Sequence, residues 1–209
     1  ILGRPEFGQT LTRSDGVFDM AANGGGPLVV NYAAPGYLPL QRQVDVRWQD
    51  YTVAPDVVMT PIDSRVTAIA ANAAAMQVHE GTPVTDGDGT RKAVLMFPAG
   101  TGAQLVLPNG STQPLAALNV RATEYTVGPN GPKAMPAPLP PTSAYTYAIE
   151  LSVDEAIAAG ANRVDFSQPV PMYVDNFLDF PVGTTVPTGY YDRIAAVWVP
   201  AANGRVIRI

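Results

Sequence analysis

The sequence predicts an all-β protein built from two tandem β-sandwich-like domains, with one short helix in the second domain. The 209 residues include 21 prolines and 19 glycines, and both residue types interrupt helices from within. In the first 60 residues, turn signals recur at intervals of about 8 to 12 residues with short apolar or alternating runs between them, and from about residue 83 a similar β pattern with longer runs returns. Because 46% of the residues are hydrophobic, the chain can also build packed cores.

The first domain is expected at residues 1–60 and begins with a hairpin. Ser14-Asp15-Gly16 separates two alternating runs, 8–12 and 17–20, and its Asp-Gly pair can adopt the positive φ of a tight turn. Turns this closely spaced are typical of a small β-sandwich. Further strands are expected at 28–32, 41–48 and 56–59, divided by turns at 23–26 and 35–39.

A connector and a second β domain follow. Residues 61–82 contain an alanine-rich stretch with few bulky side chains, which we interpret as a connector between the domains. The second domain is expected at 83–209, with a proline-rich loop at 129–141. Its strands are predicted at 93–97, 104–107, 118–127, 145–151, 163–166, 171–174, 189–191, 196–199 and 206–209.

The single predicted helix covers residues 153–159. Ser152 is expected to cap its first turn, and Glu155 stands at the position that completes a capping box. Gly160 follows a run of alanine and isoleucine and is expected to end the helix, because glycine readily adopts the left-handed conformation found there.

Composition and charge argue against several classes of protein. The net charge is −5 and the 13 basic residues form no cluster, so the main electrostatic contribution to nucleic-acid binding is missing. No apolar run approaches the roughly 20 residues of a membrane-spanning helix. The absence of cysteine excludes disulfides and thiolate metal sites. We therefore expect neither nucleic-acid binding nor membrane insertion.

Few residues could support catalysis. His79 is the only histidine and has no nucleophile motif beside it, so we interpret it as a structural residue and not as part of a catalytic triad. Asp175 and Asp179 lie in an acidic and aromatic loop and are the best candidate pair of carboxylates for a glycoside hydrolase. One such pair among 18 acidic residues is slender evidence. The prediction is that the chain is not an enzyme and uses no cofactor.

Asp86 and Asp88 are the candidate metal ligands. The stretch Thr85-Asp86-Gly87-Asp88-Gly89 begins like an EF-hand calcium loop, in which oxygen ligands occupy alternate positions. Phe97 stands where that loop requires a bidentate glutamate. The sequence therefore favours a tight acidic hairpin turn, and a calcium site is the alternative.

Aromatic side chains could bind a sugar by stacking on its ring. The alternative is that they pack in the core or between the domains, because aromatic residues bury large areas in small β domains, and the sequence favours this second interpretation. The candidate platform residues are Trp48, Tyr51, Tyr190, Tyr191 and Trp198.

Two parts of the chain resemble known families. Thr12, Gly16 and Phe18 form a Thr-x-x-x-Gly-x-Phe hairpin, followed by the Gly36-Tyr37 turn, and this pattern resembles the carboxypeptidase-regulatory or transthyretin-like β-sandwich. Downstream, the stretches ATEYTVGPNGPKAMPAPLPPTSAYTYAIELSVDEA and VDFSQPVPMYVDNFLDFPVGTTVPTGYYDR resemble the region that precedes the repeats of bacterial RHS/YD-repeat proteins, to which teneurins are similar. The resemblance implies a fibronectin-like or ZU5-like second domain and a non-catalytic region that builds or plugs the mouth of a hollow β-cage.

The predicted function follows from these observations together. We expect a non-catalytic structural and interaction module of a large secreted or cell-surface RHS-type protein, with both ends of the chain cut from a longer polypeptide. Its expected partner is the remainder of that polypeptide, the YD-repeat shell. The first alternative is a carbohydrate-binding or adhesive module with a surface glycan as its ligand, and the second is a hydrolase that uses Asp175 and Asp179.

Overall fold

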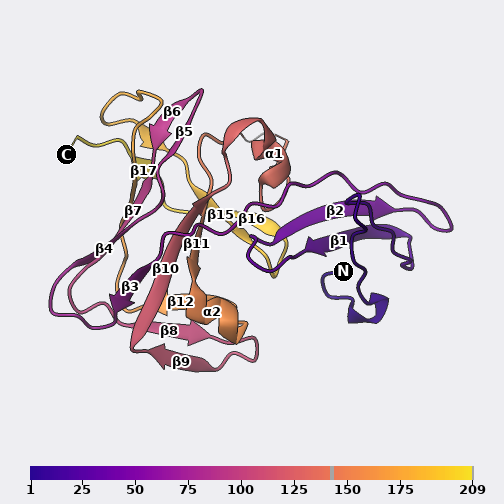
Figure 1. Ribbon diagram of the computed structural model, residues 1–209, viewed down its shortest axis with the longest axis horizontal. Coiled ribbons are helices and arrows are strands. Elements are labelled where there is room, and N and C mark those ends of the chain that lie inside the picture. The colour runs from indigo at the N-terminus through magenta and orange to yellow at the C-terminus, as the bar shows by residue number, and fades with distance from the viewer. Residues whose placement is uncertain (142–143, 209) are drawn as a thin grey trace.

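The protein is described by a computed structural model that covers residues 1–141 and 144–208, and the regular structure of these residues is almost entirely β-strand (Figure 1). The paired strands are antiparallel throughout. Within the described ranges, three sheets have three strands each and four sheets have two. The all-β class predicted from the proline, glycine and turn content is confirmed.

The N-terminal region contributes one two-stranded sheet. After the 3-10 helix η1 (Pro5–Phe7), strand β1 (Gly26–Tyr32) pairs with β2 (Leu40–Val46). The turn predicted at residues 14–16 forms, since the amide of Gly16 donates to the carbonyl of Arg13 at 2.9 Å. Its flanks, 8–12 and 17–20, are not strands, and neither is 56–59. Leu11 is 84% exposed, so no neighbouring sheet covers the flank that contains it.

The main core lies between three three-stranded sheets. Their orders are β11-β10-β3, β13-β7-β4 and β12-β8-β9. The strands are β3 (Thr67–Ala70), β4 (Gln77–Glu80), β7 (Ala93–Phe97), β8 (Ala103–Val106), β9 (Thr112–Leu115), β10 (Ala117–Glu124), β11 (Ile149–Val153), β12 (Arg163–Phe166) and β13 (Met172–Val174). The segment 61–82, expected as a connector, therefore contains two strands of this core; the predicted domain boundaries stay a prediction.

The alternation of buried and partly exposed side chains along the strands determines which residues form the core. In β7, the side chains of Ala93, Leu95 and Phe97 are buried while the residues between them are partly exposed, as the two-residue period of a strand requires. Phe97 packs edge-on against Phe166 of β12, with ring centroids 5.8 Å apart. The core also contains Ile69, Ala103, Leu118, Val120, Ala122 and Val153.

The predicted helix is present as α2 (Asp154–Ala159). Gly160 ends it in the left-handed conformation, at φ 60°, as expected. The capping prediction is wrong: no side chain caps the helix, because Ser152 lies within β11 opposite Arg121, and Glu155 instead binds Asn119. A second, four-residue helix that the sequence did not predict, α1 (Gly131–Ala134), follows the 3-10 turn η2 (Gly128–Asn130).

Four short pairs complete the described structure. They are β5 (Val84–Asp86) with β6 (Gly89–Arg91), β14 (Thr185–Val186) with β17 (Gly204–Arg205), and β15 (Gly189–Asp192) with β16 (Val197–Pro200), besides β1 with β2. A second apolar cluster joins Leu38 and Leu40 to Tyr125, Met135 and the partly buried Trp198. Among the described residues, no helix has the length and apolar character to cross a membrane.

Burial is concentrated in the middle of the chain. Every buried residue of the described ranges lies between Leu38 and Val153, and residues 1–37 and 154–208 contain none. The two ends of the chain therefore do not form closed cores of their own, although β12 and β13 extend the central sheets and Phe166 packs against the core.

Candidate binding site at the β5–β6 hairpin

The acidic motif at residues 85–89 forms the tight β5–β6 hairpin. Asp86 of β5 pairs with Gly89 of β6, and the hydroxyls of Thr85 and Thr90 lie 2.8 Å apart across the strands. Gly89 adopts φ +123°, a region that other residues rarely occupy. A β-carbon there would also lie 3.4 Å from the carbonyl oxygen of Phe177. The turn therefore depends on glycine at this position.

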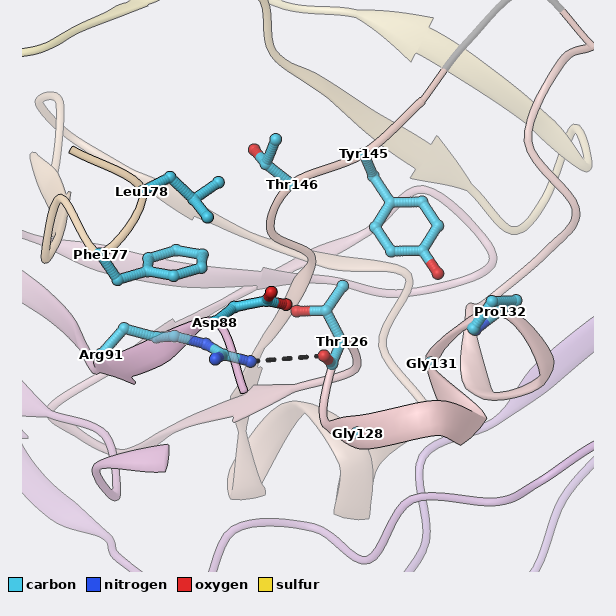
Figure 2. Close-up of a pocket in the computed structure, with 10 residues that line it drawn as sticks. All are labelled: Asp88, Arg91, Thr126, Gly128, Gly131, Pro132, Tyr145, Thr146, Phe177 and Leu178. Carbon is cyan, nitrogen blue, oxygen red and sulfur yellow. Dashed lines mark hydrogen bonds between the residues drawn. The ribbon is translucent and has the colours of Figure 1, made fainter. Parts of the chain in front are cut away.

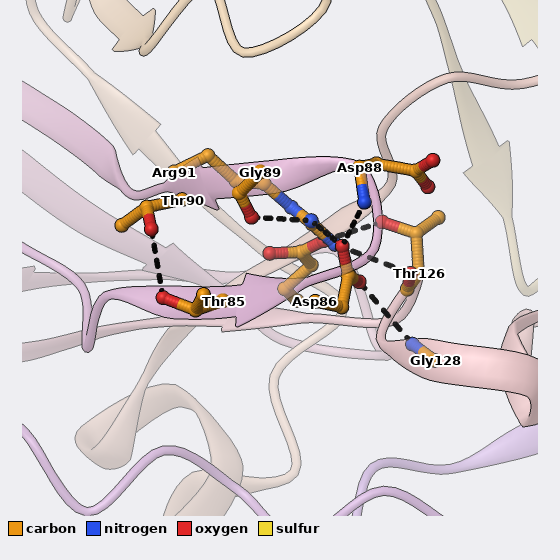
Figure 3. A network of polar contacts seen from close by, with 9 residues as sticks. Thr85, Asp86, Asp88, Gly89, Thr90, Arg91, Thr126 and Gly128 are labelled. Atoms are coloured by element: carbon orange, nitrogen blue, oxygen red, sulfur yellow. Dashed lines mark hydrogen bonds and ion pairs between the residues drawn. The ribbon is translucent and has the colours of Figure 1, made fainter.

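Arg91 forms the centre of a buried ionic network at the end of this hairpin (Figure 3). Its side chain is 1% exposed. The guanidinium donates to both carboxylate oxygens of Asp86, including Nη2 to Oδ2 at 2.8 Å, and its Nε and Nη2 donate to Oε1 of Glu124 at 2.8 and 2.6 Å. Nη2 also reaches the carbonyl of Thr126 at 3.3 Å. Charge-assisted, bidentate bonds of this kind are the strongest that arginine makes.

The aromatic ring of Phe177 covers the same guanidinium. The Cζ atom of Arg91 lies 4.7 Å from the ring centroid, within the range of a cation–π contact. The hydrogen bond from Arg91 holds the pKa of Asp86 well below its usual range, and this bond with the other contacts to Asp86 and Glu124 raises the pKa of Arg91. Asp86 and Arg91 therefore stay ionised throughout the physiological pH range.

Asp88 is the acidic residue that the network leaves free. Its amide donates to Oδ1 of Asp86 at 3.0 Å, whereas in Figure 3 no dashed line reaches its carboxylate. The single guanidinium of Arg91 offsets only one of the three carboxylates of Asp86, Asp88 and Glu124. The formal net charge of these four groups is therefore −2.

A pocket of about 260 Å³ opens beside this hairpin. Figure 2 shows Phe177 and Arg91 on one side of it, Tyr145 and Pro132 on the other, and Asp88 between them. Burial raises the pKa of Tyr145, so its hydroxyl is neutral and can donate or accept a hydrogen bond. The other lining residues are Thr126, Gly128, Gly131, Thr146 and Leu178. The polar groups of this lining are the carboxylate of Asp88, the guanidinium of Arg91 and the hydroxyls of Thr126, Tyr145 and Thr146.

The calcium prediction concerned the same two aspartates. A cation bound by Asp86 would compete with the guanidinium of Arg91, which already occupies both of its oxygens. In the part of the chain that the structure describes, no three His, Asp or Glu side chains are grouped so that they could hold a metal ion. Calcium binding at Asp86 and Asp88 stays a prediction, and this geometry offers it no additional ligand.

The carboxylates predicted for a hydrolase do not line this pocket. Oδ2 of Asp175 accepts a hydrogen bond from the amide of Lys92 at 3.0 Å. Asp179 is exposed in a turn held by Asn176, whose side chain bonds the backbone of Phe180 in both directions. Neither arrangement resembles two carboxylates facing each other across a cleft.

The five candidate aromatic residues fall into two groups. Trp48 and Tyr51 lie in the loop after β2, 66% and 99% exposed. Tyr191 and Trp198 pair across the β15–β16 hairpin, with ring centroids 5.3 Å apart, and both are bonded to the body of the protein. Tyr190 is on the opposite face of that hairpin and is 55% exposed. Because β2 runs away from this hairpin, the structure does not gather the five rings on one surface (Figure 1).

His79 is fully buried on β4. Its Nδ1 lies 2.9 Å from the hydroxyl of Thr67, and its Nε2 has no hydrogen-bond partner among the described residues. Burial is the main cause that lowers the pKa of His79. The ring is therefore neutral at pH 7 and belongs to the core.

A polar joint connects the N-terminal sheet to the rest of the chain. The side-chain amide of Gln41 donates to Asn31 at 2.8 Å and to the carbonyl of Arg193 at 3.0 Å, and its oxygen accepts the hydroxyl hydrogen of Tyr191 at 2.7 Å. Arg42, buried beside it, donates to the carbonyls of Gln41, Lys133 and Met135. Sequence reasoning missed this joint and the Arg91 network, because each depends on a contact between distant residues, such as Arg91 with Glu124 and Gln41 with Tyr191.

Comparison with known proteins gives one family match and several partial matches to relatives. Residues 1–59 match the family model described as the teneurin TTR-like domain. The chain is 36% identical over 62 residues to Teneurin-m of Drosophila melanogaster, covering 30% of this chain and 2% of that protein. It is 38% identical over 55 residues to Teneurin-3 of Danio rerio, covering 26% of this chain and 2% of that protein. No solved structure matches. The region at residues 1–59 is thus similar to a teneurin TTR-like domain, as its Thr12, Gly16 and Phe18 pattern predicted.

Proposed function

We propose that this chain is a non-catalytic structural module of a larger teneurin-like protein. In this proposal the module lies next to an RHS/YD-repeat shell of a secreted or cell-surface polypeptide and packs against it through its N-terminal region. The similarity of residues 1–59 to the teneurin TTR-like domain supports a structural role. The chain spans about 2% of the length of the curated relatives it matches, so a comparable module would act inside a much longer chain.

The observation that carries this proposal is the open N-terminal region. Leu11, Tyr51 and Val53 are 84%, 99% and 92% exposed, although all three are large apolar or aromatic side chains. The segment is far from a closed β-sandwich, since its only sheet is the β1–β2 pair. Large apolar side chains exposed in this way suit a surface that another polypeptide covers.

In this proposal the N-terminal sheet is attached to the rest of the chain at its inner end, while its outer surface stays exposed. Gln41 and Arg42 of β2 bind the body of the chain through the polar joint, and Leu38 and Leu40 bury their side chains against Tyr125. The inner end of the N-terminal sheet is thereby fixed. The loop after β2 is left to contact the parent protein.

Hydrogen–deuterium exchange tests this function. Amide exchange of residues 8–20 and 47–56 would be measured in the isolated chain and in the full-length protein that contains it. We expect exchange in these two segments to slow at least about tenfold in the full-length protein, since docking would cover them. Equal exchange rates in both forms would reject the packing role.

A double substitution tests the same surface, and a single substitution elsewhere is its matched control. Tyr51→Ser with Val53→Ser removes two exposed apolar groups, and we expect it to restore fast exchange in the full-length protein without changing the unfolding midpoint of the isolated chain. Met76→Ser, also at an exposed position between β3 and β4, is expected to leave the exchange of residues 47–56 unchanged.

One observation favours the alternative, a glycan-binding module. Trp48 and Tyr51 are both largely exposed in one loop. Binding of the purified chain to a glycan array that is lost in Trp48→Ala, and retained in Trp198→Ala, would support that alternative. An array without binding would leave the structural module as the better account.

A further inference from the structure

We propose that the pocket beside the β5–β6 hairpin binds one basic side chain, an arginine or a lysine, presented by another polypeptide segment. This pocket involves none of the exposed N-terminal residues on which the packing role depends. The two proposals can therefore succeed or fail separately.

The size of the pocket favours a single side chain. Its volume of about 260 Å³ lies below the range of about 300 to 1,000 Å³ that is usual for sites of drug-sized ligands and cofactors. Asp88, Pro132 and Thr146 on its walls are exposed, so the pocket opens to the surface. A side chain projecting from a neighbouring segment can therefore enter it.

The charge of the pocket selects a cation. Asp86 and Glu124 share the guanidinium of Arg91, whose donors are all directed at these carboxylates and at the carbonyls of Gly89 and Thr126. Arg91 therefore has no donor left for an anionic ligand. Asp88 contributes a carboxylate that the network does not use, and the net charge of −2 attracts a positive group.

The remaining walls suit the stem and head of a basic side chain. Phe177 and Tyr145 lie on opposite sides of the opening (Figure 2), and aromatic side chains pack against the methylene stems of arginine and lysine. The neutral hydroxyls of Tyr145 and Thr146 can accept hydrogen bonds from a guanidinium or an ammonium group. The carboxylate of Asp88 then pairs with the charge.

The proposal assigns separate roles to the two aspartates of the Asp-Gly-Asp-Gly motif. Asp86 is used inside the protein, because Arg91 and the amides of Asp88 and Gly128 bind its oxygens. Asp88, in the turn itself, lines the pocket and would pair with the ligand. Thus one aspartate maintains the shape of the hairpin and the other recognises the partner.

Amide-resolved NMR titration of the complete chain tests the inference. The probes are N-acetyl-arginine methylamide, its lysine counterpart and the neutral isostere N-acetyl-citrulline methylamide. We expect the two basic probes to shift the amides of Asp88, Gly89, Phe177 and Leu178 saturably, with dissociation constants on the order of 1 mM, as suits ligands of so few atoms. The citrulline probe is expected to bind at least about threefold more weakly. Equal shifts with citrulline, or no shifts with either basic probe, would overturn the proposal.

Two variants and one further titration complete the experiment. Asp88→Asn should weaken the arginine probe at least about threefold, whereas the exposed turn variant Asp15→Asn should leave its affinity unchanged. Unchanged affinity in Asp88→Asn would contradict the assignment of that carboxylate. Calcium chloride alone is titrated in parallel, and shifts of the same amides by calcium but not by the arginine probe would replace this inference with a metal site.

Discussion

The middle and the two ends of this chain are stabilised in different ways. Residues 38–153 contain every buried side chain of the described structure, whereas residues 1–37 and 154–208 contain none, although they make up a large part of the chain. In the middle, apolar strands face one another across closed sheets. At the ends, β12 and β13 extend two of the core sheets, while the remaining segments leave apolar residues such as Leu11, Val182 and Ile194 exposed. The contrast teaches that buried side chains are concentrated in the centre, while the ends contribute edge strands and exposed surface.

The largest effect is expected in the core. Phe97→Ala removes a side chain that is 1% exposed and packs against Phe166, so we expect the free energy of unfolding to fall by about 3 to 5 kcal/mol. Chemical denaturation measures the change. The matched terminal variant Leu11→Ala, at an 84% exposed position, should change the same quantity by less than about 0.5 kcal/mol. Similar losses in the two variants would abolish the distinction between the centre and the ends.

An intermediate effect is expected at the polar joint. Tyr191→Phe deletes the hydroxyl that donates to Gln41, and we expect a loss of about 0.5 to 1.5 kcal/mol. Amide exchange should accelerate in residues 189–200 and 40–42, because the β15–β16 hairpin loses a contact with the N-terminal sheet. Acceleration spread evenly over the core strands would instead show that the joint is part of the central structure. Tyr190→Phe, on the exposed face of the same hairpin, is the control.

The smallest effect concerns pH. Burial lowers the pKa of His79 below its usual value of 6.5, so the unfolded chain binds a proton at a higher pH than the folded chain does. Stability is therefore expected to be constant above about pH 7 and to fall as the pH decreases through 6.5. The charged groups facing the ring are Asp63, Arg65, Glu80 and Arg121.

Unfolding midpoints at pH 7.5, 6.5 and 5.5 measure this loss, and His79→Gln should remove most of it. Asp63 cannot account for a change in this window, since hydrogen bonds from Thr82 and Arg65 outweigh the opposing effect of its burial and keep its pKa below 3.8. A loss of stability that persists in His79→Gln would assign the pH dependence to another group.

Local signals in the sequence were sufficient for several elements. The alternation at 93–97 gave the strand β7 with both its ends, and 163–166 gave β12. Gly160 ended its helix as predicted. These elements depend on a two-residue period or on one glycine conformation, which are properties of a short stretch of chain.

Other elements could not be predicted in this way. Residues 67–70 have too few bulky groups to indicate a strand, and they become β3 because Leu118 and its neighbours in β10 offer a pairing edge. Ser152 has the residue type of a helix cap, yet pairing with Arg121 holds it in a strand. The runs beside Ser14 alternate like strands, yet no sheet covers the exposed Leu11 and Val17, and they stay irregular. In each case a neighbour distant in sequence decided the outcome.

The sequence by itself determined the all-β class, the position of the one predicted helix, the tight Asp-Gly turns and the similarity of residues 1–59 to the teneurin TTR-like domain. Only the tertiary structure decided that Arg91 is buried between Asp86 and Glu124, and that Asp88 is left to face a pocket. The physical reason is that turn and strand preferences act within a few residues. The burial and neutralisation of a charge depend instead on which distant strands the folded chain brings together.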